Sequence, residues 1–155
     1  VYCTQAKALL DKLKIPYEKI ERGTTNSLPF SNGTFDYLLT WNSCYYMSEG
    51  KKLDFQKHVK EMARVIKTKG WIICSIPKKT SFIYKNSKLA RQKGYRIISK
   101  DPWGQRKGEI MRYFESRKDM VSEFDNYFKK FHHADINMDW FELNYHWHIF
   151  VAQKK

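Results

Sequence analysis

Two short apolar runs separated by an amphipathic helix constrain this chain more than any other feature. The first run covers residues 35–41 and the second covers residues 71–76, and each is short enough for a strand that is buried on both faces. Between them, from about Asp54 to Lys67, apolar residues recur at helical spacing. Gly70 follows, in the position where a glycine often ends a helix. A strand, a crossover helix and a strand form a right-handed parallel unit. We therefore predict an α/β fold in which the two runs are neighbouring parallel strands.

The order of residues in this stretch resembles the middle of the class I methyltransferases, which use S-adenosylmethionine. In that family a Leu-Pro-Phe loop leads to a strand that begins Phe-Asp, and the following helix ends in an acid, an arginine and a lysine before a glycine turn. The matching residues here are Leu28, Pro29, Phe30, Phe35, Asp36, Glu61, Met62, Arg64, Val65, Ile66, Lys67 and Gly70. The ordered series covers about a third of the chain, and it implies a doubly wound, mostly parallel sheet with an antiparallel C-terminal strand.

The C-terminal third agrees with that fold. Ser116 and Asp119 suit the start of a helix that runs to about Lys129. Two strands are expected near residues 131–137 and 145–153, and the last one alternates two sets of side chains. One face would carry Tyr145, Trp147, Ile149 and Val151, and the other His146, His148 and Phe150.

The beginning of the chain departs from the family. Residues 1–3 are typical of the tail of a strand, a helix is expected from a Thr4 cap through Lys14, and residues 15–20 can form a strand. The first family strand and its glycine-rich loop are missing, and no such turn occurs elsewhere in the sequence. We expect a fragment of a longer methyltransferase that alone binds the cofactor poorly; the alternative is a degenerate homologue.

Composition sets broad limits. A chain of 155 residues with 42% hydrophobic and 16% aromatic residues fits one domain with a real core. The formal net charge of +13 suits a solvated basic surface, an acidic substrate or nucleic acid. Cys3, Cys44 and Cys74 lack metal-type spacing and are typical of reduced thiols in a cytoplasmic protein. No apolar run approaches the roughly 20 residues of a transmembrane helix.

Residues 78–113 form a basic segment within which the excess charge is concentrated. Residues 81–84 and 87–91 could be helical turns, residues 94–98 could be a strand, and residues 101–108 form a turn-rich loop. A segment after the fifth family strand resembles the element that covers the substrate in some small-molecule methyltransferases. We expect residues 78–113 to be such an insert within a single domain.

The resemblance implies a cofactor site at the carboxyl ends of the strands. Tyr2 and Thr24 stand where the family usually has acids, so they offer weaker contacts to the ribose and adenine. Aromatic rings at the corner after the first predicted strand could face the sulfonium. The candidate cofactor-binding residues are Tyr2, Thr24, Thr25, Asn26, Trp41, Asn42 and Ser43.

Methyl transfer requires alignment and, in some cases, a base. Tyr45, Tyr46 and His146 are the candidate catalytic residues, and no metal site is expected because His146 and His148 lack a third ligand placed by the sequence. The corner has neither an Asn/Asp-Pro-Pro-aromatic motif nor a Pro-Cys pair, which disfavours nucleic-acid bases as acceptors.

We therefore predict S-adenosylmethionine-dependent methyl transfer to a small molecule or a glycan or lipid precursor. Two alternatives stay open. One is a non-catalytic basic α/β module that binds nucleic acid or an acidic partner, motivated by the net charge of +13. The other is a degenerate methyltransferase scaffold, motivated by Tyr2 and Thr24. The sequence does not indicate an oligomeric state.

Overall fold

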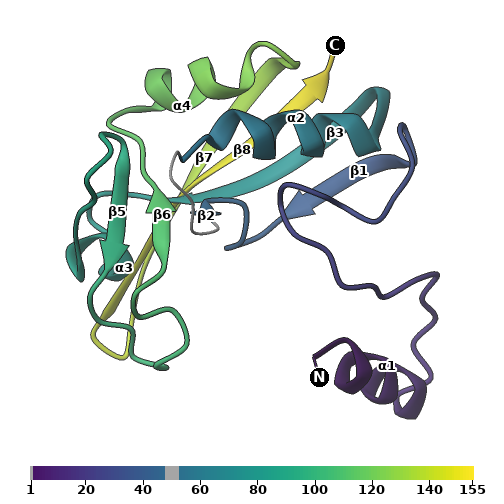
Figure 1. The fold of residues 1–155 in the computed structure, drawn as a ribbon, viewed down its shortest axis with the longest axis horizontal. Helices are drawn as coiled ribbons and strands as arrows, with labels where there is room; N and C mark the ends of the chain where they lie inside the picture. The colour runs from purple at the N-terminus through teal and green to yellow at the C-terminus, as the bar shows by residue number, and fades with distance from the viewer. Residues whose placement is uncertain (1, 48–52) are drawn as a thin grey trace.

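The chain folds into two four-stranded sheets, described here from a computed structural model that covers residues 2–47 and 53–155. Figure 1 shows the larger sheet behind helices α2 and α4, with the smaller sheet beside it and helix α1 apart from both. The elements in chain order are α1 (Tyr2–Lys12), β1 (Phe35–Thr40), β2 (Tyr46–Met47), α2 (Phe55–Val65), β3 (Ile66–Pro77), α3 (Phe82–Lys85), β4 (Ser87–Leu89), β5 (Tyr95–Ile98), β6 (Ile110–Arg112), α4 (Arg117–Phe124), β7 (Phe128–Trp140) and β8 (Leu143–Lys154).

The larger sheet has the strand order β1-β3-β8-β7, and it confirms the predicted α/β unit. Strands β1 and β3 are parallel, with Leu38 opposite Ile72 and Thr40 opposite Cys74. Strand β8 runs antiparallel to both β3 and β7, so three of the four strands point the same way. Helices α2 and α4 pack against each other on one face (Figure 1). The doubly wound arrangement stays a prediction.

Strand β1 is less buried than its apolar sequence predicted. The expectation of burial on both faces is wrong, because the side chains of Tyr37 and Leu39 are 68% and 62% exposed. Both side chains lie on the face of the sheet opposite α2, and β1 is an edge strand of the described sheet. Apolar composition therefore indicated a strand correctly but not how many of its faces are covered.

Helix α2 starts where expected and ends earlier. The Asp54 carboxylate accepts a hydrogen bond from the Gln56 backbone N–H group at 3.1 Å and caps the first turn. The helix ends at Val65 rather than Lys67, and β3 begins at Ile66. Gly70 lies within β3 and does not end the helix: a Cβ atom there would lie 2.7 Å from Ile66 Cγ2 and 2.8 Å from the Asp36 carbonyl oxygen. Close backbone approach, not helix termination, requires this glycine.

Helix α4 also begins as predicted and ends early. The Ser116 hydroxyl accepts from the Asp119 N–H group at 3.1 Å. The helix ends at Phe124 rather than near Lys129, because the chain turns so that Phe128 can begin β7. The ring centroids of Phe124 and Phe150 lie 4.8 Å apart, which fastens α4 to β8. Together with Phe55, Val59 and Met62 of α2, these rings form the core between the helices and the larger sheet.

The smaller sheet has the order β2-β6-β5-β4, and most of it comes from the predicted insert. Helix α3 confirms the helical turn expected at residues 81–84, and β5 confirms the strand at 94–98. The helical turn expected at residues 87–91 is wrong. Residues 87–89 instead form β4, because they pair with β5 from Ser87 opposite Ile98 to Leu89 opposite Arg96.

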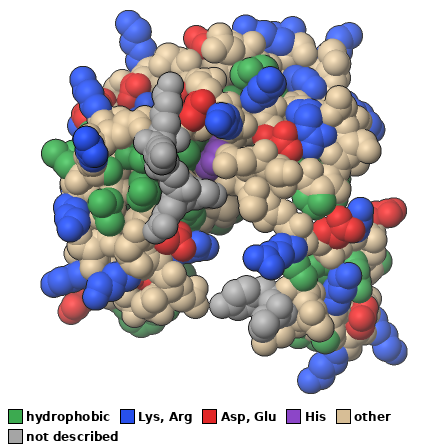
Figure 2. All heavy atoms as spheres, viewed as in Figure 1, with side chains coloured by type: hydrophobic (Ala, Val, Ile, Leu, Met, Phe, Trp, Pro, Cys, Tyr) green, Lys and Arg blue, Asp and Glu red, His purple; other side chains and the backbone are tan. Residues whose placement is uncertain are grey.

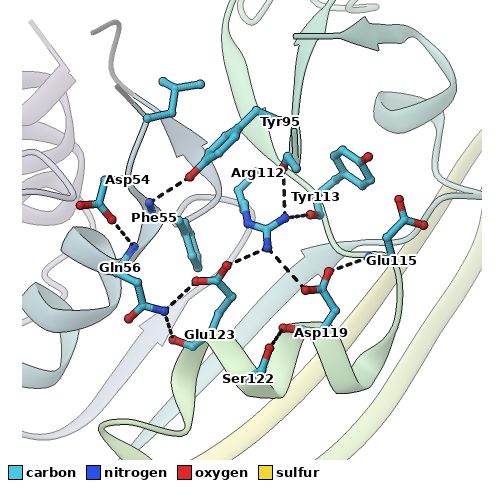
Figure 3. Close-up of polar contacts among 12 residues, drawn as sticks. Asp54, Phe55, Gln56, Tyr95, Arg112, Tyr113, Glu115, Asp119, Ser122 and Glu123 are labelled. Atoms are coloured by element: carbon cyan, nitrogen blue, oxygen red, sulfur yellow. Dashed lines mark hydrogen bonds and ion pairs between the residues drawn. The ribbon is translucent and has the colours of Figure 1, made fainter. Parts of the chain in front are cut away.

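A buried arginine joins the smaller sheet to the helices (Figure 3). Arg112 of β6 is 8% exposed, and its guanidinium lies 2.7 Å from a Glu123 oxygen and 3.6 Å from an Asp119 oxygen. It also donates to the carbonyl oxygens of Gly94 and Tyr113. Gly94 has φ of +86°, and a Cβ atom there would lie 2.8 Å from Arg112 Nη1.

The first residues differ most from the prediction. Tyr2, Cys3 and Thr4 lie inside helix α1 and do not end a strand, and Val1 lies outside the described residues. The helix runs from Tyr2 to Lys12 instead of from Thr4 to Lys14. The strand expected at residues 15–20 is absent from the described chain, where this segment is irregular. No strand of the described sheets lies beside it to supply hydrogen-bond partners.

Candidate functional site

The corner after β1 is held by hydrogen bonds to β3 and β8. Asn42 has φ of 51°, a left-handed conformation that asparagine tolerates better than most residues. Its backbone N–H group donates to the Ser75 hydroxyl at 2.7 Å, and its Oδ1 accepts from that hydroxyl at 3.2 Å. Its side-chain amide also donates to the Tyr145 hydroxyl. These bonds fix the Asn42 side chain at the carboxyl ends of β1 and β3.

Tyr145 and Trp147 complete this corner from strand β8, and the sequence prediction did not include them among the site residues. Their rings are stacked with centroids 3.9 Å apart, and Trp147 is 1% exposed. The Trp147 indole N–H group lacks a partner in hydrogen-bond geometry within the described residues, although it lies near enough to the Tyr45 hydroxyl to offset part of the rise that burial causes in the pKa of Tyr45. The alternation of β8 placed both rings on one face, and that pattern could have indicated them.

The loop before β1 is held by the residue pair that carried much of the family resemblance. The Glu61 carboxylate accepts from the Leu28 N–H group at 2.8 Å and pairs with Arg64 at 2.7 Å. The Arg64 guanidinium also donates to the Phe30 and Leu28 carbonyl oxygens, at 2.7 and 3.1 Å. The hydrogen bond from Arg64 lowers the pKa of Glu61, so the pair stays ionised. The motif therefore fastens residues 28–32 to helix α2.

His58 links the preceding loop to the corner, and sequence reasoning missed it. It is fully buried in α2, with Nδ1 3.0 Å from the Cys44 carbonyl oxygen and Nε2 3.3 Å from the Thr25 hydroxyl. Burial lowers the pKa of His58, which favours the neutral ring. Thr24 and Ser27 exchange two backbone hydrogen bonds, which close the turn that carries Thr25. The sequence feature that could have indicated His58 is its position on the apolar face of the predicted helix.

Two adjoining cavities bring most of the predicted site residues together. A cavity of about 420 Å³ is lined by Thr24, Thr25 and Ser43, with Tyr46 and Arg106. A second cavity, of about 230 Å³, is lined by Asn42, Tyr45, Tyr46, Arg106, Tyr145 and Trp147. We call them the hydroxyl cavity and the polar cavity. Tyr46 and Arg106 belong to both, and the Arg106 guanidinium lies 4.4 Å from the Tyr46 ring centroid.

The two tyrosines of this corner are set up to remain protonated. Burial raises the pKa of Tyr45 well above its ordinary value, and Tyr45 is fully buried. Burial also raises the pKa of Tyr46. A phenol with a raised pKa donates or accepts hydrogen bonds at neutral pH and does not act as a phenolate base. The structure therefore favours positioning roles for Tyr45 and Tyr46.

Other predicted site residues lie apart from this corner. Tyr2 lies in α1 rather than at a strand end, and Asn26 is exposed in the turn closed by Thr24 and Ser27. Trp41 directly precedes Asn42 and is 43% exposed. His146 bonds to the Thr80 hydroxyl at 2.9 Å and lies 3.2 Å from an Asp139 oxygen, while the neighbouring Tyr145 reaches Asn42.

A second polar cluster lies on strands β7 and β8. Asp135 bonds to His148 at 2.8 Å, Arg117 at 2.9 Å and Lys78 at 3.3 Å. Burial alone would raise the pKa of Asp135, but these three bonds outweigh it and lower the pKa far below its ordinary value. Within residues 2–47 and 53–155, no group of three or more His, Cys, Asp or Glu side chains is arranged to hold a metal ion.

Comparison with known proteins gives a consistent class. A sequence model of the methyltransferase-domain family matches residues 2–74. A methyltransferase of Thermotoga maritima, described as S-adenosylmethionine-dependent and a possible histamine N-methyltransferase, superimposes with a TM-score of 0.62 at 18% identity, over 96% of this chain and 69% of that one. An S-adenosylmethionine-dependent methyltransferase of Methanosarcina mazei gives 0.58 at 18% identity, over 88% and 66%. A protein of Pyrococcus horikoshii gives 0.63 at 16% identity, over 99% and 66%. No curated protein matches the chain significantly.

The fold is thus an α/β fold of the class I methyltransferase type. The resemblance found in the sequence is confirmed: residues 2–74 match the methyltransferase-domain family, and the chain shares its fold with proteins described as S-adenosylmethionine-dependent methyltransferases. It spans about two thirds of the length of the solved structures that it matches. In the described residues, no helix is both long and apolar enough to cross a membrane.

Proposed function

We propose that the protein transfers a methyl group from S-adenosylmethionine to a small molecule, and that the corner after β1 is where transfer occurs. The observation that carries the proposal is the convergence of the predicted residues Thr24, Thr25, Asn42 and Ser43 on two cavities that share Tyr46. This position at the carboxyl ends of parallel strands is where α/β sheets bind ligands.

The side chains fit such a cofactor at its polar groups. The hydroxyl cavity offers the oxygens of Thr24, Thr25 and Ser43 to an adenosyl group, although it has no acid at the position of Thr24. The rings of Tyr45 and Tyr46, with centroids 4.5 Å apart, provide negative aromatic faces near the point where a sulfonium would lie. Asn42, fixed by Ser75 and Tyr145, lines the polar cavity together with these two rings.

When bound, S-adenosylmethionine supplies an electrophilic methyl group. Transfer of that methyl group would leave the demethylated product, and an acceptor that carries a proton would lose it. The contribution of this chain is alignment of the acceptor with the methyl group. Burial raises the pKa of both Tyr45 and Tyr46, so we assign them to positioning and not to proton removal.

The experiment is a calorimetric titration of S-adenosylhomocysteine into the full-length protein and into two variants. Asn42→Ala removes the side chain at the corner, whereas Tyr37→Ala removes an aromatic ring that is 68% exposed on the opposite sheet face. Binding that weakens in Asn42→Ala and is unchanged in Tyr37→Ala supports the proposal. Absence of heat with either the cofactor or its demethylated product counts against it.

The finer expectations belong to the same proposal. We assign the smaller sheet and the loop at residues 101–108 to the cover of a small-molecule, glycan or lipid-precursor acceptor, since Asp101, Trp103 and Arg106 line the polar cavity. The thiols of Cys44 and Cys74 are hydrogen-bonded at 3.3 Å and form no disulfide, which agrees with a reducing, cytoplasmic setting. On the face shown in Figure 2, Lys and Arg side chains are spread out and interspersed with Asp and Glu, so this face carries no continuous basic patch of the kind that binds nucleic acid.

A further inference from the structure

An aromatic pocket opens beside the polar cavity, and nothing in the methyl-donor site accounts for it. Its volume is about 400 Å³, and it is lined by Phe82, Trp103, Trp140, Phe141, Leu143 and Tyr145. The pocket lies between α3, the loop at residues 101–108 and the turn that joins β7 to β8. Three of its walls, Phe82, Trp103 and Tyr145, also line the polar cavity. The two spaces are therefore parts of one cleft with an apolar end and a polar end.

Aromatic contacts run along the cleft without interruption. Ring centroids of Trp103 and Phe82 are 5.6 Å apart, and those of Phe82 and Trp147 are 5.7 Å apart. Trp147 then stacks on Tyr145 at 3.9 Å. At the open end, Trp140 and Phe141 stack with centroids 5.9 Å apart while remaining 61% and 83% exposed. Exposed stacked rings around a hollow indicate a surface for a flat apolar ligand.

The polar end contains a buried donor that lacks a partner. The Trp147 indole N–H group is buried and has no partner in hydrogen-bond geometry among the described residues. Trp147 is one of the residues that line the polar cavity, and its indole lies close to the Tyr45 hydroxyl. A buried unpaired donor costs free energy, and a ligand oxygen would remove that cost. A protonated amine cannot accept this hydrogen bond, whereas a hydroxyl or phenolate oxygen can.

Charge also selects the kind of ligand. None of the six residues that line the aromatic pocket is acidic, and the chain as a whole carries a formal net charge of +13. Asp101 lies at the polar cavity, but its carboxylate already accepts from the backbone N–H groups of Trp103, Gln105 and Arg106 at 3.3, 2.7 and 2.8 Å. Its role is to shape the loop that carries Trp103. The aromatic pocket therefore offers no carboxylate that could pair with a cationic acceptor.

We infer that this cleft binds a planar aromatic hydroxy compound, with its ring in the aromatic pocket and its oxygen accepting a hydrogen bond from Trp147. The role of this compound rests on the proposed function: as the methyl acceptor it is converted to its methyl ether. The step forms an oxygen–carbon bond and breaks the carbon–sulfur bond of the donor, and the hydroxyl proton is released. Ligand recognition itself requires only the aromatic pocket and Trp147, and it is testable without the methyl donor.

The test is a titration of the chain with 2-naphthol, followed by the indole N–H resonances of the tryptophans in nitrogen-15 NMR spectra. The inference predicts saturable shifts of Trp103, Trp140 and Trp147, and weaker binding of both decahydro-2-naphthol, which is not planar, and naphthalene, which has no oxygen. Tighter binding of 2-naphthyltrimethylammonium would overturn the inference in favour of a cation site. Protection of Trp140 by anionic phosphatidylglycerol vesicles, with no 2-naphthol binding, would overturn it in favour of a membrane contact.

Variants locate the two ends of the cleft. Trp140→Ala removes an exposed wall and should weaken 2-naphthol binding about fivefold, whereas Tyr37→Ala, similarly exposed on the larger sheet, should leave it unchanged. Trp147→Phe keeps a ring but removes the N–H group, so it should weaken 2-naphthol binding about fivefold and leave naphthalene binding unchanged. Equal 2-naphthol affinity in Trp140→Ala and in the unmodified chain would overturn the inference even if Trp147→Phe fails to fold.

A parallel titration with S-adenosylhomocysteine separates this inference from the proposed function. Binding of S-adenosylhomocysteine without binding of 2-naphthol would overturn the inference alone. Binding of 2-naphthol without binding of S-adenosylhomocysteine would leave the aromatic site in place and overturn the proposed function.

Discussion

Replacing Arg112 with methionine should destabilise the chain by about 3 kcal/mol, because it removes one partner of a buried ionic cluster. The guanidinium is 9% exposed and contacts Glu123 at 2.7 Å, and it donates to the carbonyl oxygens of Gly94 and Tyr113 (Figure 3). Breaking such a pair from one side typically costs about 3–5 kcal/mol. The lower value is expected here, since Glu123 is 21% exposed and keeps a 2.7 Å hydrogen bond from Gln56.

The measurement is urea unfolding monitored by circular dichroism, with the free energy of unfolding compared between Arg112→Met and Arg106→Met. Arg106→Met is the same chemical change, but it breaks an exposed ion pair: the side chains of Arg106 and Glu109 are 45% and 37% exposed. Its loss of stability should therefore be about 1 kcal/mol or less. The double variant Arg112→Met/Glu123→Gln should recover part of the loss, because the unpaired charge is gone. A loss below about 1 kcal/mol for Arg112→Met would refute the argument that this cluster fastens the smaller sheet to α2 and α4.

Three further results are expected. Arg64→Met should lower the free energy of unfolding and speed amide hydrogen exchange at Leu28, because the variant leaves two loop carbonyl oxygens without their donor; unchanged exchange would contradict that role. Asp135→Asn should reduce the loss of stability on acidification: the pKa of Asp135 is lowered in the folded chain, so its contribution is present above the ordinary carboxyl pKa of about 3.9 and is lost as the pH falls below it. Identical curves of stability against pH for the unmodified chain and for Asp135→Asn would contradict this role of Asp135. Ser75→Ala should weaken binding of S-adenosylhomocysteine without unfolding the chain, as it removes two of the three hydrogen bonds that hold Asn42 and leaves only the one to Tyr145; unaltered affinity would show that Asn42 is held in place without Ser75.

The central parallel unit could be predicted from sequence because its signals are local. Two apolar runs and an amphipathic helix of ordinary length allow few arrangements, and β1, α2 and β3 adopt the expected one. The C-terminal strand pair was predictable for the same reason, since the alternation of residue types over residues 145–151 is a local signal. The burial of β8 follows that alternation only in part, because Trp147 and Phe150 are both buried although they were predicted on opposite faces. Exposure of Tyr37 was not predictable, because it depends on what lies against the far face of the sheet and not on the strand itself.

The candidate site was predicted in part. Asn42 and Ser43 lie at the site because they come shortly after β1, a strand with a local sequence signal. Thr24 and Thr25 reach it although the strand predicted before them is absent, and Thr25 contacts the buried His58 of α2. Tyr145 and Trp147 reach the corner from residues about a hundred positions away, and only the antiparallel register of β8 against β3 brings them there. Tyr2 was misplaced because a helix and the end of a strand cannot be distinguished over three residues.

The most direct measurement is the set of backbone amide NMR shifts that S-adenosylhomocysteine produces in the full-length protein. We expect saturable shifts centred on Thr25, Asn42, Ser43 and Tyr46, with little change at Gly94 in the Arg112 cluster. Shifts confined to the Arg112 cluster, or no shifts at saturating ligand, would contradict the assignment of the corner after β1 to the methyl donor.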